Sequence, residues 1–144
     1  MNITQHFTLE EFERSATARR LGISNTIPQS LIPSITNLCT EILEPLRMFV
    51  AQPVVISSGY RCPRLNSAVC GSPTSQHMRG EACDIRIPSV KEGKEWMRWI
   101  MDNTSFDQLI WERNAQGTFW IHVSCKLRAE DNRHKVISMI KILK

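Results

Sequence analysis

The sequence predicts an α+β domain in which helices pack on a small antiparallel sheet. Helical patterns dominate the N-terminal part of the chain, and patterns typical of strands dominate the rest. Two strand-like runs also flank a short loop that contains glycine, as in a β-hairpin. Because no internal boundary is visible, residues 1–144 are expected to form a single domain.

Two helices are predicted from capping boxes, in which a hydroxyl residue is followed three positions later by glutamate. Thr8 and Glu11 form one such pair in TLEEFERS, and Ser89 and Glu92 form the other. The second helix is expected to run to about Met101, where its apolar pattern ends.

A longer amphipathic helix is predicted between Pro28 and about Val50. Pro33 fits in its first turn, whereas Pro45 lies too deep and is expected to kink the helix or end it locally. The apolar side is marked by residues in steps of three and four, namely Leu31, Ile35, Leu38, Ile42, Leu46 and Phe49.

The remaining patterns are typical of strands. PVVISSGYR is rich in β-branched residues and ends near Gly59, and EACDIRI alternates so that Asp84 shares a face with Ala82 and Arg86. FDQLIWE and TFWIHVS flank RNAQG and predict the hairpin. The tail NRHKVISMIKILK alternates from His134 and favours a strand, with a helix as the alternative.

Composition limits the class of protein. The chain has 144 residues, 42% hydrophobic and 22% charged, which is enough for one core without disulfides. Five cysteines without a C-x-x-C motif favour reduced thiols, with a Cys62–Cys70 disulfide as the alternative under oxidation. The formal charge of +4 suits an anionic polymer, but no basic run with interleaved aromatics indicates nucleic acid.

The candidate site begins in SQHMRGEACD, where His77 and Asp84 are seven positions apart. Gly80 lets the backbone turn closely between them, and His122 follows in the strand WIHVS. Two imidazoles and a carboxylate are a three-ligand set for catalytic zinc, with the fourth position open for water. The alternative for a strand histidine such as His122 is an ordinary polar group with its hydrogen bonds satisfied.

These motifs resemble one known family. The pattern S-x-H-x-x-G-x-A-x-D that begins at Ser75, followed by His122 in WIHVS, is similar to the zinc D-Ala-D-Ala carboxypeptidase and L-Ala-D-Glu endopeptidase family. That family shares its fold with the signalling domain of hedgehog proteins. SSGYRCPRLNSAV is similar to a second region of the family, and the resemblance covers roughly residues 7–124.

The resemblance implies roles for particular residues. His77, Asp84 and His122 would bind Zn²⁺, and Arg61 and Ser75 would help to hold the substrate or its developing oxyanion. The alternatives are a surface arginine at position 61 and a serine that only caps the loop at position 75. Tyr60 and Asn66 are expected to hold the loop rather than to act on substrate.

The general base is where the sequence departs from the family. Many relatives carry an acidic residue three positions before the last histidine, and Phe119 stands there in this chain. Glu112, at the end of the first hairpin strand, is the candidate instead, provided that its strand face is the face of His122. The alternative is a solvated glutamate at the end of the hairpin, and Asp107 is the next candidate base.

The sequence therefore predicts a single zinc peptidase domain, residues 1–144, that cleaves peptidoglycan stem peptides as a carboxypeptidase or an endopeptidase. The N-terminus lacks a basic region followed by an apolar run, and no apolar run is long enough for a membrane span. We expect a protein that is cytoplasmic as synthesised and released by a phage-type route, as for an endolysin-like lysis enzyme. The alternative, which Phe119 supports, is a non-catalytic hedgehog-like zinc-binding module.

Overall fold

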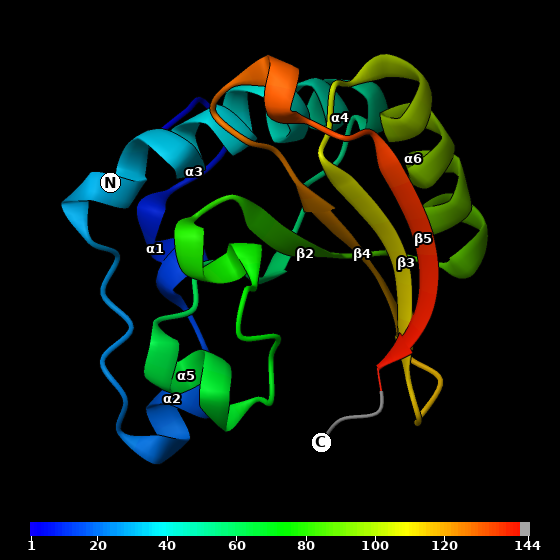
Figure 1. Cartoon of the computed structure of the whole chain (residues 1–144). Coiled ribbons are helices and arrows are strands. Elements are labelled where there is room, and N and C mark those ends of the chain that lie inside the picture. The colour runs from blue at the N-terminus through cyan, green and yellow to red at the C-terminus, as the bar shows by residue number, and fades with distance from the viewer. Residues whose placement is uncertain (142–144) are drawn as a thin grey trace.

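The protein is described by a computed structural model that covers residues 1–141, with side chains to residue 138. The last residues of the predicted domain and C-terminal strand, 142–144, lie outside the described part (Figure 1). The elements are, in chain order, α1 (Leu9–Glu13), α2 (Ala16–Leu21), η1 (Gln29–Leu31), α3 (Ile32–Leu38), η2 (Cys39–Leu43), α4 (Glu44–Val50), β1 (Ile56–Ser58), α5 (Pro63–Ala68), η3 (Gln76–Arg79), β2 (Ala82–Arg86), α6 (Val90–Asn103), β3 (Gln108–Asn114), β4 (Phe119–Ser124), η4 (Ala129–Asp131) and β5 (Lys135–Lys141).

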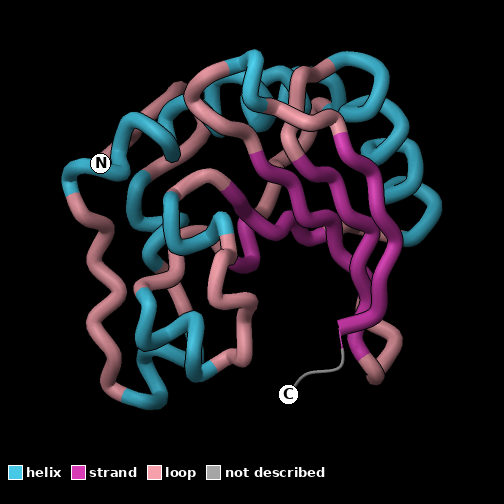
Figure 2. Tube along the Cα trace, viewed as in Figure 1, coloured by secondary structure: helices cyan, strands magenta, loops and turns pink. Residues whose placement is uncertain are grey.

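The strands form one curved sheet in the order β1-β2-β4-β3-β5 (Figure 2). The pairs β1–β2, β2–β4 and β4–β3 are antiparallel, and the last pair includes the predicted hairpin. This arrangement of helices on a mainly antiparallel sheet confirms the predicted α+β class.

The C-terminal segment forms the predicted strand, but β5 pairs with β3 in parallel rather than antiparallel fashion. The end of β4 lies beside the start of β3, where Ser124 Oγ accepts a hydrogen bond of 3.0 Å from the Gln108 amide. The loop that follows brings the Lys135 amide to 2.8 Å from the Asp107 carbonyl oxygen. The chain therefore enters β5 at the end where β3 begins, and the two strands run in the same direction.

The two faces of the sheet serve different purposes because side chains alternate along each strand. One face packs against helices that include α4 and α6 (Figure 1), and its core residues are Cys83, Ile85, Leu109, Ile121 and Val123. On the other face, the register places Asp84 opposite His122, His122 opposite Ile110, and Trp120 opposite Glu112. The polar side chains of three strands are thereby collected on one surface.

Both predicted helix starts are confirmed. Thr8 Oγ accepts a hydrogen bond from the Glu11 amide (3.3 Å), and the Glu11 carboxylate accepts one from the Thr8 amide (3.1 Å). Ser89 Oγ accepts from the Glu92 amide (3.1 Å), and α6 extends two residues beyond the predicted end, to Asn103. None of the helices in residues 1–141 combines the length and apolarity needed to cross a membrane.

The long helix predicted around Pro45 is interrupted as expected. Pro33 lies in the first turn of α3, and a turn of π-helix, Cys39–Leu43, separates α3 from α4, which has Pro45 in its own first turn. Proline cannot donate the helical hydrogen bond and clashes with the preceding turn, so the wider π geometry accommodates it. Phe49 departs from the predicted apolar face, because it is half exposed and stacks on Trp99 at 5.1 Å.

The cysteines are unpaired, as the composition indicates, and Cys62 and Cys70 are not joined. Cys39, Cys83 and Cys125 are buried, and burial raises the pKa of the Cys39 thiol to about 12. Thiols in such surroundings stay protonated and act as small apolar side chains.

The carboxylate of Asp107 ties the start of β3 to the segment before β5. The Arg133 guanidinium donates to it from Nε (3.0 Å) and Nη2 (2.8 Å), and the Arg133 amide donates to Oδ1 (2.9 Å). Burial alone would raise the pKa of Asp107, but these hydrogen bonds and the arginine charge outweigh it and lower the pKa.

We expect Asp107→Asn to lower the free energy of unfolding by about 1–3 kcal/mol, because hydrogen bonds to a charged group are lost. The folded-state pKa of Asp107 is lowered, so the wild-type advantage is complete above about pH 4 and shrinks as the pH falls through the folded pKa. Urea unfolding of both proteins at neutral and acidic pH measures this. The exposed Asp102→Asn is the control, and an undiminished difference in acid would contradict the assignment.

Candidate active site

Three side chains with metal-ligand chemistry meet on the polar face of the sheet. His77 comes from η3, Asp84 from β2 and His122 from β4, and all three are buried. His77 Nε2 lies 3.4 Å from Asp84 Oδ1, and His122 Nδ1 lies 3.1 Å from the same oxygen. One ligand atom from each residue falls within 4.8 Å of the others, so a single ion could contact all three.

Local backbone structure brings His77 to the strand that carries Asp84. Gly80 ends η3 with a φ of 68°, in the left-handed region that favours glycine, and the chain turns there into β2. The close turn predicted at Gly80 is therefore confirmed. The register of β2 and β4 then sets Asp84 directly opposite His122.

The orientation of His77 is fixed by a backbone carbonyl. His77 Nδ1 lies 2.6 Å from the Gly59 oxygen, which can only accept, so Nδ1 carries the proton and Nε2 presents a lone pair toward Asp84. Burial lowers the pKa of His77, which favours the neutral ring. Burial would raise the pKa of Asp84, but the two imidazoles outweigh it and lower the pKa, which favours the carboxylate.

The donor set fits a zinc ion. His77 Nε2 and Asp84 Oδ1 face each other at 3.4 Å, and imidazole nitrogen and carboxylate oxygen are both common zinc ligands. The Gly59 carbonyl supplies the outer hydrogen bond that orients such a histidine ligand. His77, Asp84 and His122 could therefore hold zinc.

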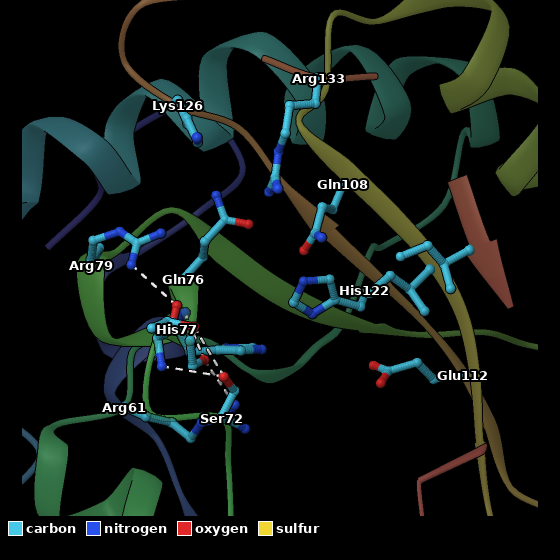
Figure 3. Close-up of a pocket in the computed structure, with 14 residues that line it drawn as sticks. Arg61, Ser72, Gln76, His77, Arg79, Gln108, Glu112, His122, Lys126 and Arg133 are labelled. Carbon is cyan, nitrogen blue, oxygen red and sulfur yellow. Dashed lines mark hydrogen bonds between the residues drawn. The ribbon is translucent and has the colours of Figure 1, made fainter. Parts of the chain in front are cut away.

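The two histidines open onto a cleft of about 500 Å³. Three more residues proposed from the sequence line the same cleft, namely Arg61, Ser75 and Glu112. Figure 3 shows Arg61 and Glu112 there. The site residues named from the sequence are thus brought together, and Asp84 contacts both histidine rings.

Arg61 is held in place at the edge of the cleft. Its Nε donates to Asn66 Oδ1 (3.2 Å), its Nη2 donates to Ser75 Oγ (3.3 Å), and its amide donates to the His77 carbonyl oxygen (3.1 Å). These contacts are unlike those of a freely solvated surface arginine. Asn66 has the loop-holding role that the sequence indicates.

Ser75 acts as an anchor within the site. Its Oγ accepts hydrogen bonds from the His77 amide (3.2 Å) and from Arg61, and it caps η3. Ser75 therefore caps the loop, as one of the two alternatives from the sequence stated. Its hydroxyl hydrogen stays available to a molecule in the cleft.

Glu112 is buried, with 3% of its surface exposed, so the solvated alternative for this residue is wrong. Trp120 Nε1 donates to Glu112 Oε1 at 2.9 Å. Glu112 follows Ile110 by two residues, and Ile110 pairs with His122, so Glu112 has the strand face that the prediction required. Asp107, the next candidate base, has both oxygens engaged by Arg133.

Two residues that hold the Arg61 loop were missed in the sequence. Asn25 donates to the Tyr60 carbonyl oxygen (2.9 Å) and accepts from the Cys62 amide (2.8 Å), so it fixes the peptide units on both sides of Arg61. Gly59 approaches the backbone of α1 so closely that a Cβ there would lie 2.6 Å from an α1 Cα atom. Asn25 has no local signal, whereas Gly59 could have been noted from its place in SSGYR.

Comparison with protein families identifies the family to which this chain belongs. The peptidase M15 family model matches residues 5–124, which extend from before α1 to the end of β4. The chain belongs to the peptidase M15 family. The M15 match contains every site residue discussed above and agrees with the resemblance seen in the sequence. Comparison with curated proteins gave no match.

Membership of the M15 family makes the chain a metallopeptidase by family, and M15 peptidases are typically zinc-dependent. The His77, Asp84 and His122 group is a site in this fold that could bind such a metal. β5 and the loop before it follow the matched residues, and β5 pairs with β3 at the edge of the sheet.

We expect the purified protein to bind about one zinc ion per chain, and His77→Ala or His122→Ala to lose most of it, because three ligands leave no spare. The measurement is metal analysis after dialysis, with circular dichroism to show that each variant is folded. The exposed His134→Ala is the matched control and should keep its zinc. Full zinc content in both site variants would mean that the ligands are elsewhere.

Proposed function

We propose that this M15 family member is a zinc metallopeptidase that cleaves peptidoglycan stem peptides, with residues 1–144 as one zinc peptidase domain. The observation that carries the proposal is the group His77, Asp84 and His122, whose ligand atoms lie within 4.8 Å of one another beside a cleft. An arginine and a second carboxylate line that cleft and supply the other groups that peptide hydrolysis needs.

In this proposal, His77, Asp84 and His122 hold Zn²⁺. When bound, the ion polarises the scissile carbonyl and acidifies a water molecule. A ligand set with a single carboxylate would leave net positive charge at the ion, which would favour the negative charge that develops on the carbonyl oxygen. The Gly59 carbonyl keeps the His77 ring in the required tautomer.

Glu112 is the proposed general base. Its carboxylate takes the proton of the attacking water and returns it to the amine that leaves. The hydrogen bond from Trp120 Nε1 to Oε1 orients the carboxylate. Burial of Glu112 beside the cleft limits competing water.

Arg61 is the proposed anion-binding group. The guanidinium is held by Asn66 and Ser75 at the cleft edge, where it can pair with a substrate carboxylate or with the developing oxyanion. Burial lowers the pKa of Arg61 and the charges of Asp84 and Glu112 oppose that effect, so the cation is partly desolvated and binds an anion more strongly. Ser75 would donate its hydroxyl hydrogen to the same substrate group.

The alternative of a non-catalytic zinc-binding module is weaker. Its support is Phe119, which replaces an acidic residue of the family pattern. The buried Glu112 on the same strand face as His122 supplies a carboxylate from a neighbouring strand. We therefore favour an enzyme with a relocated base, acting on the cell wall as a lysis enzyme of endolysin type.

The test is digestion of purified peptidoglycan and synthetic stem peptides by the zinc-loaded protein, with products identified by mass spectrometry. We expect one peptide bond to gain a water molecule. Release of a terminal D-alanine would show a carboxypeptidase, and cleavage between L-alanine and D-glutamate would show an endopeptidase. A protein that binds zinc and cleaves no stem peptide would support the binding module.

We expect Glu112→Gln to reduce kcat by at least about a hundredfold, because the amide keeps the shape but cannot take the proton. Folding and zinc content should be unchanged, since Glu112 is not a proposed ligand. Glu95→Gln on the exposed side of α6 is the control. Wild-type turnover in the Glu112 variant would place the base elsewhere, and loss of zinc would mean that Glu112 is a ligand.

We expect Arg61→Lys to lower kcat/KM by about tenfold or more while zinc content stays normal. Lysine keeps the charge but cannot reproduce the planar fork that pairs with a carboxylate and with Asn66 and Ser75. Steady-state kinetics on the best stem peptide give the measurement. An unchanged kcat/KM would return Arg61 to a purely structural role.

A further inference from the structure

One end of the cleft is built by residues that follow the M15 match. Lys126, Arg133 and Ile137 line the cleft together with residues of the matched part, and all three lie beyond residue 124. Figure 3 shows Lys126 and Arg133 at the end of the cleft opposite Arg61, with Gln76 and Gln108 between them and the histidines. This end, which we call the Lys126 end, is therefore built in part by residues beyond those that the family model matches.

The Lys126 end carries a net positive charge. Arg133 is compensated by Asp107, which it binds through two hydrogen bonds. Within the described residues, the Lys126 ammonium makes no hydrogen bond or ion pair. The Lys126 backbone is nevertheless fixed, because its amide donates to Asn132 Oδ1 (2.8 Å) and its carbonyl accepts from Asn37 Nδ2 (3.2 Å). The Lys126 charge acts on Asp107, but no direct contact in the described residues holds the ammonium, so this positioned cation is suited to an anionic ligand.

Gln76 adds an unpartnered acceptor to the same end. Only 6% of its surface is exposed, and its Nε2 donates to Glu81 Oε1 at 3.1 Å. Because a carboxylate can only accept, this bond fixes which amide atom is nitrogen. Gln76 Oε1 is buried and has no hydrogen-bond partner in the described residues. Such an oxygen costs free energy until an N–H group reaches it.

The geometry points to a subsite at the Lys126 end for a peptide group that carries a carboxylate next to an amide, –CO–NH–CHR–COO⁻. Lys126 pairs with the carboxylate, and Gln76 Oε1 accepts the hydrogen bond of the amide N–H. This inference rests on the proposed function in that the ligand is part of a peptide substrate. It makes the free carboxylate of an acidic stem peptide a specificity determinant at the end of the cleft away from Arg61.

Three small probes test the subsite on the zinc-loaded, ¹⁵N-labelled protein by NMR titration. N-acetylglycine has both the amide N–H and the carboxylate, N-acetylglycinamide lacks the charge, and acetoxyacetic acid replaces N–H by oxygen. We expect each change to weaken binding by about fivefold, the range for one partly exposed ion pair or one hydrogen bond. The side-chain amide signals of Gln76 should shift with N-acetylglycine.

Lys126→Met should remove the preference for N-acetylglycine over its carboxamide, whereas Lys91→Met on exposed α6 should keep it. Because the carboxylate could instead bind the metal or Arg61, an unchanged preference in Lys126→Met would overturn the subsite. Equal binding of acetoxyacetic acid and N-acetylglycine would overturn the role of Gln76.

Turnover gives a separate readout with two stem peptides that differ only in one carboxylate or carboxamide. We expect Lys126→Met to lower kcat/KM about fivefold for the acidic peptide and not for the amidated one. If no stem peptide is cleaved but the probes bind as described, the proposed function fails and the subsite stands. If peptides are cleaved and Lys126→Met keeps the acidic preference, the subsite fails and the proposed function stands.

Discussion

The register between β2 and β4 is the constraint on which the site depends. It sets Asp84 opposite His122, and the next register, between β4 and β3, sets Ile110 opposite His122 and therefore Glu112 on the same face. A slip of one residue in either pairing would turn these side chains into the apolar core and bring core residues to the cleft. Because the opposite face is filled by residues such as Ile85 and Ile121, burial of the core protects the register.

That constraint has an electrostatic cost that the fold must offset. A carboxylate and two imidazoles are buried together, and burial by itself opposes the charge on Asp84. The surrounding structure contributes specific hydrogen bonds, above all that between His77 Nδ1 and the Gly59 carbonyl. The result is a His77 ring held in the tautomer that presents Nε2 to a divalent ion before any ion arrives.

Much of the fold could be predicted because its signals are local. The caps at Thr8 and Ser89, the interruption near Pro45 and the hairpin follow from residues a few positions apart. The grouping of His77 with Asp84 also has a short spacing and a glycine turn to support it. Assigning His122 and Glu112 to the same site requires knowing which face of its strand each residue occupies. The alternation of side chains along a strand gives these faces once the hairpin is recognised.

The features that could not be predicted depend on contacts between distant residues. The parallel direction of β5 follows from where β4 ends beside β3, which no pattern within the last strand records. Asn25, which is distant in the sequence, holds the Arg61 loop by hydrogen bonds. Trp120 orients Glu112 by a hydrogen bond across the hairpin. The hydrogen bond between Arg61 and Ser75 depends on how the loop closes, which the spacing of the two residues does not show.

The position of β5 at the sheet edge has a consequence for how such enzymes diversify. The proposed ligands, base and arginine all lie within residues 5–124, whereas one wall of the cleft comes from the segment that follows. β5 lies at the edge of the sheet and pairs with β3, so a change in β5 leaves the β1–β2, β2–β4 and β4–β3 pairings in place. The proposed catalytic residues and the residues that select the substrate would then lie in different segments of the chain. A substitution after residue 124 would change substrate specificity and leave the catalytic residues unchanged.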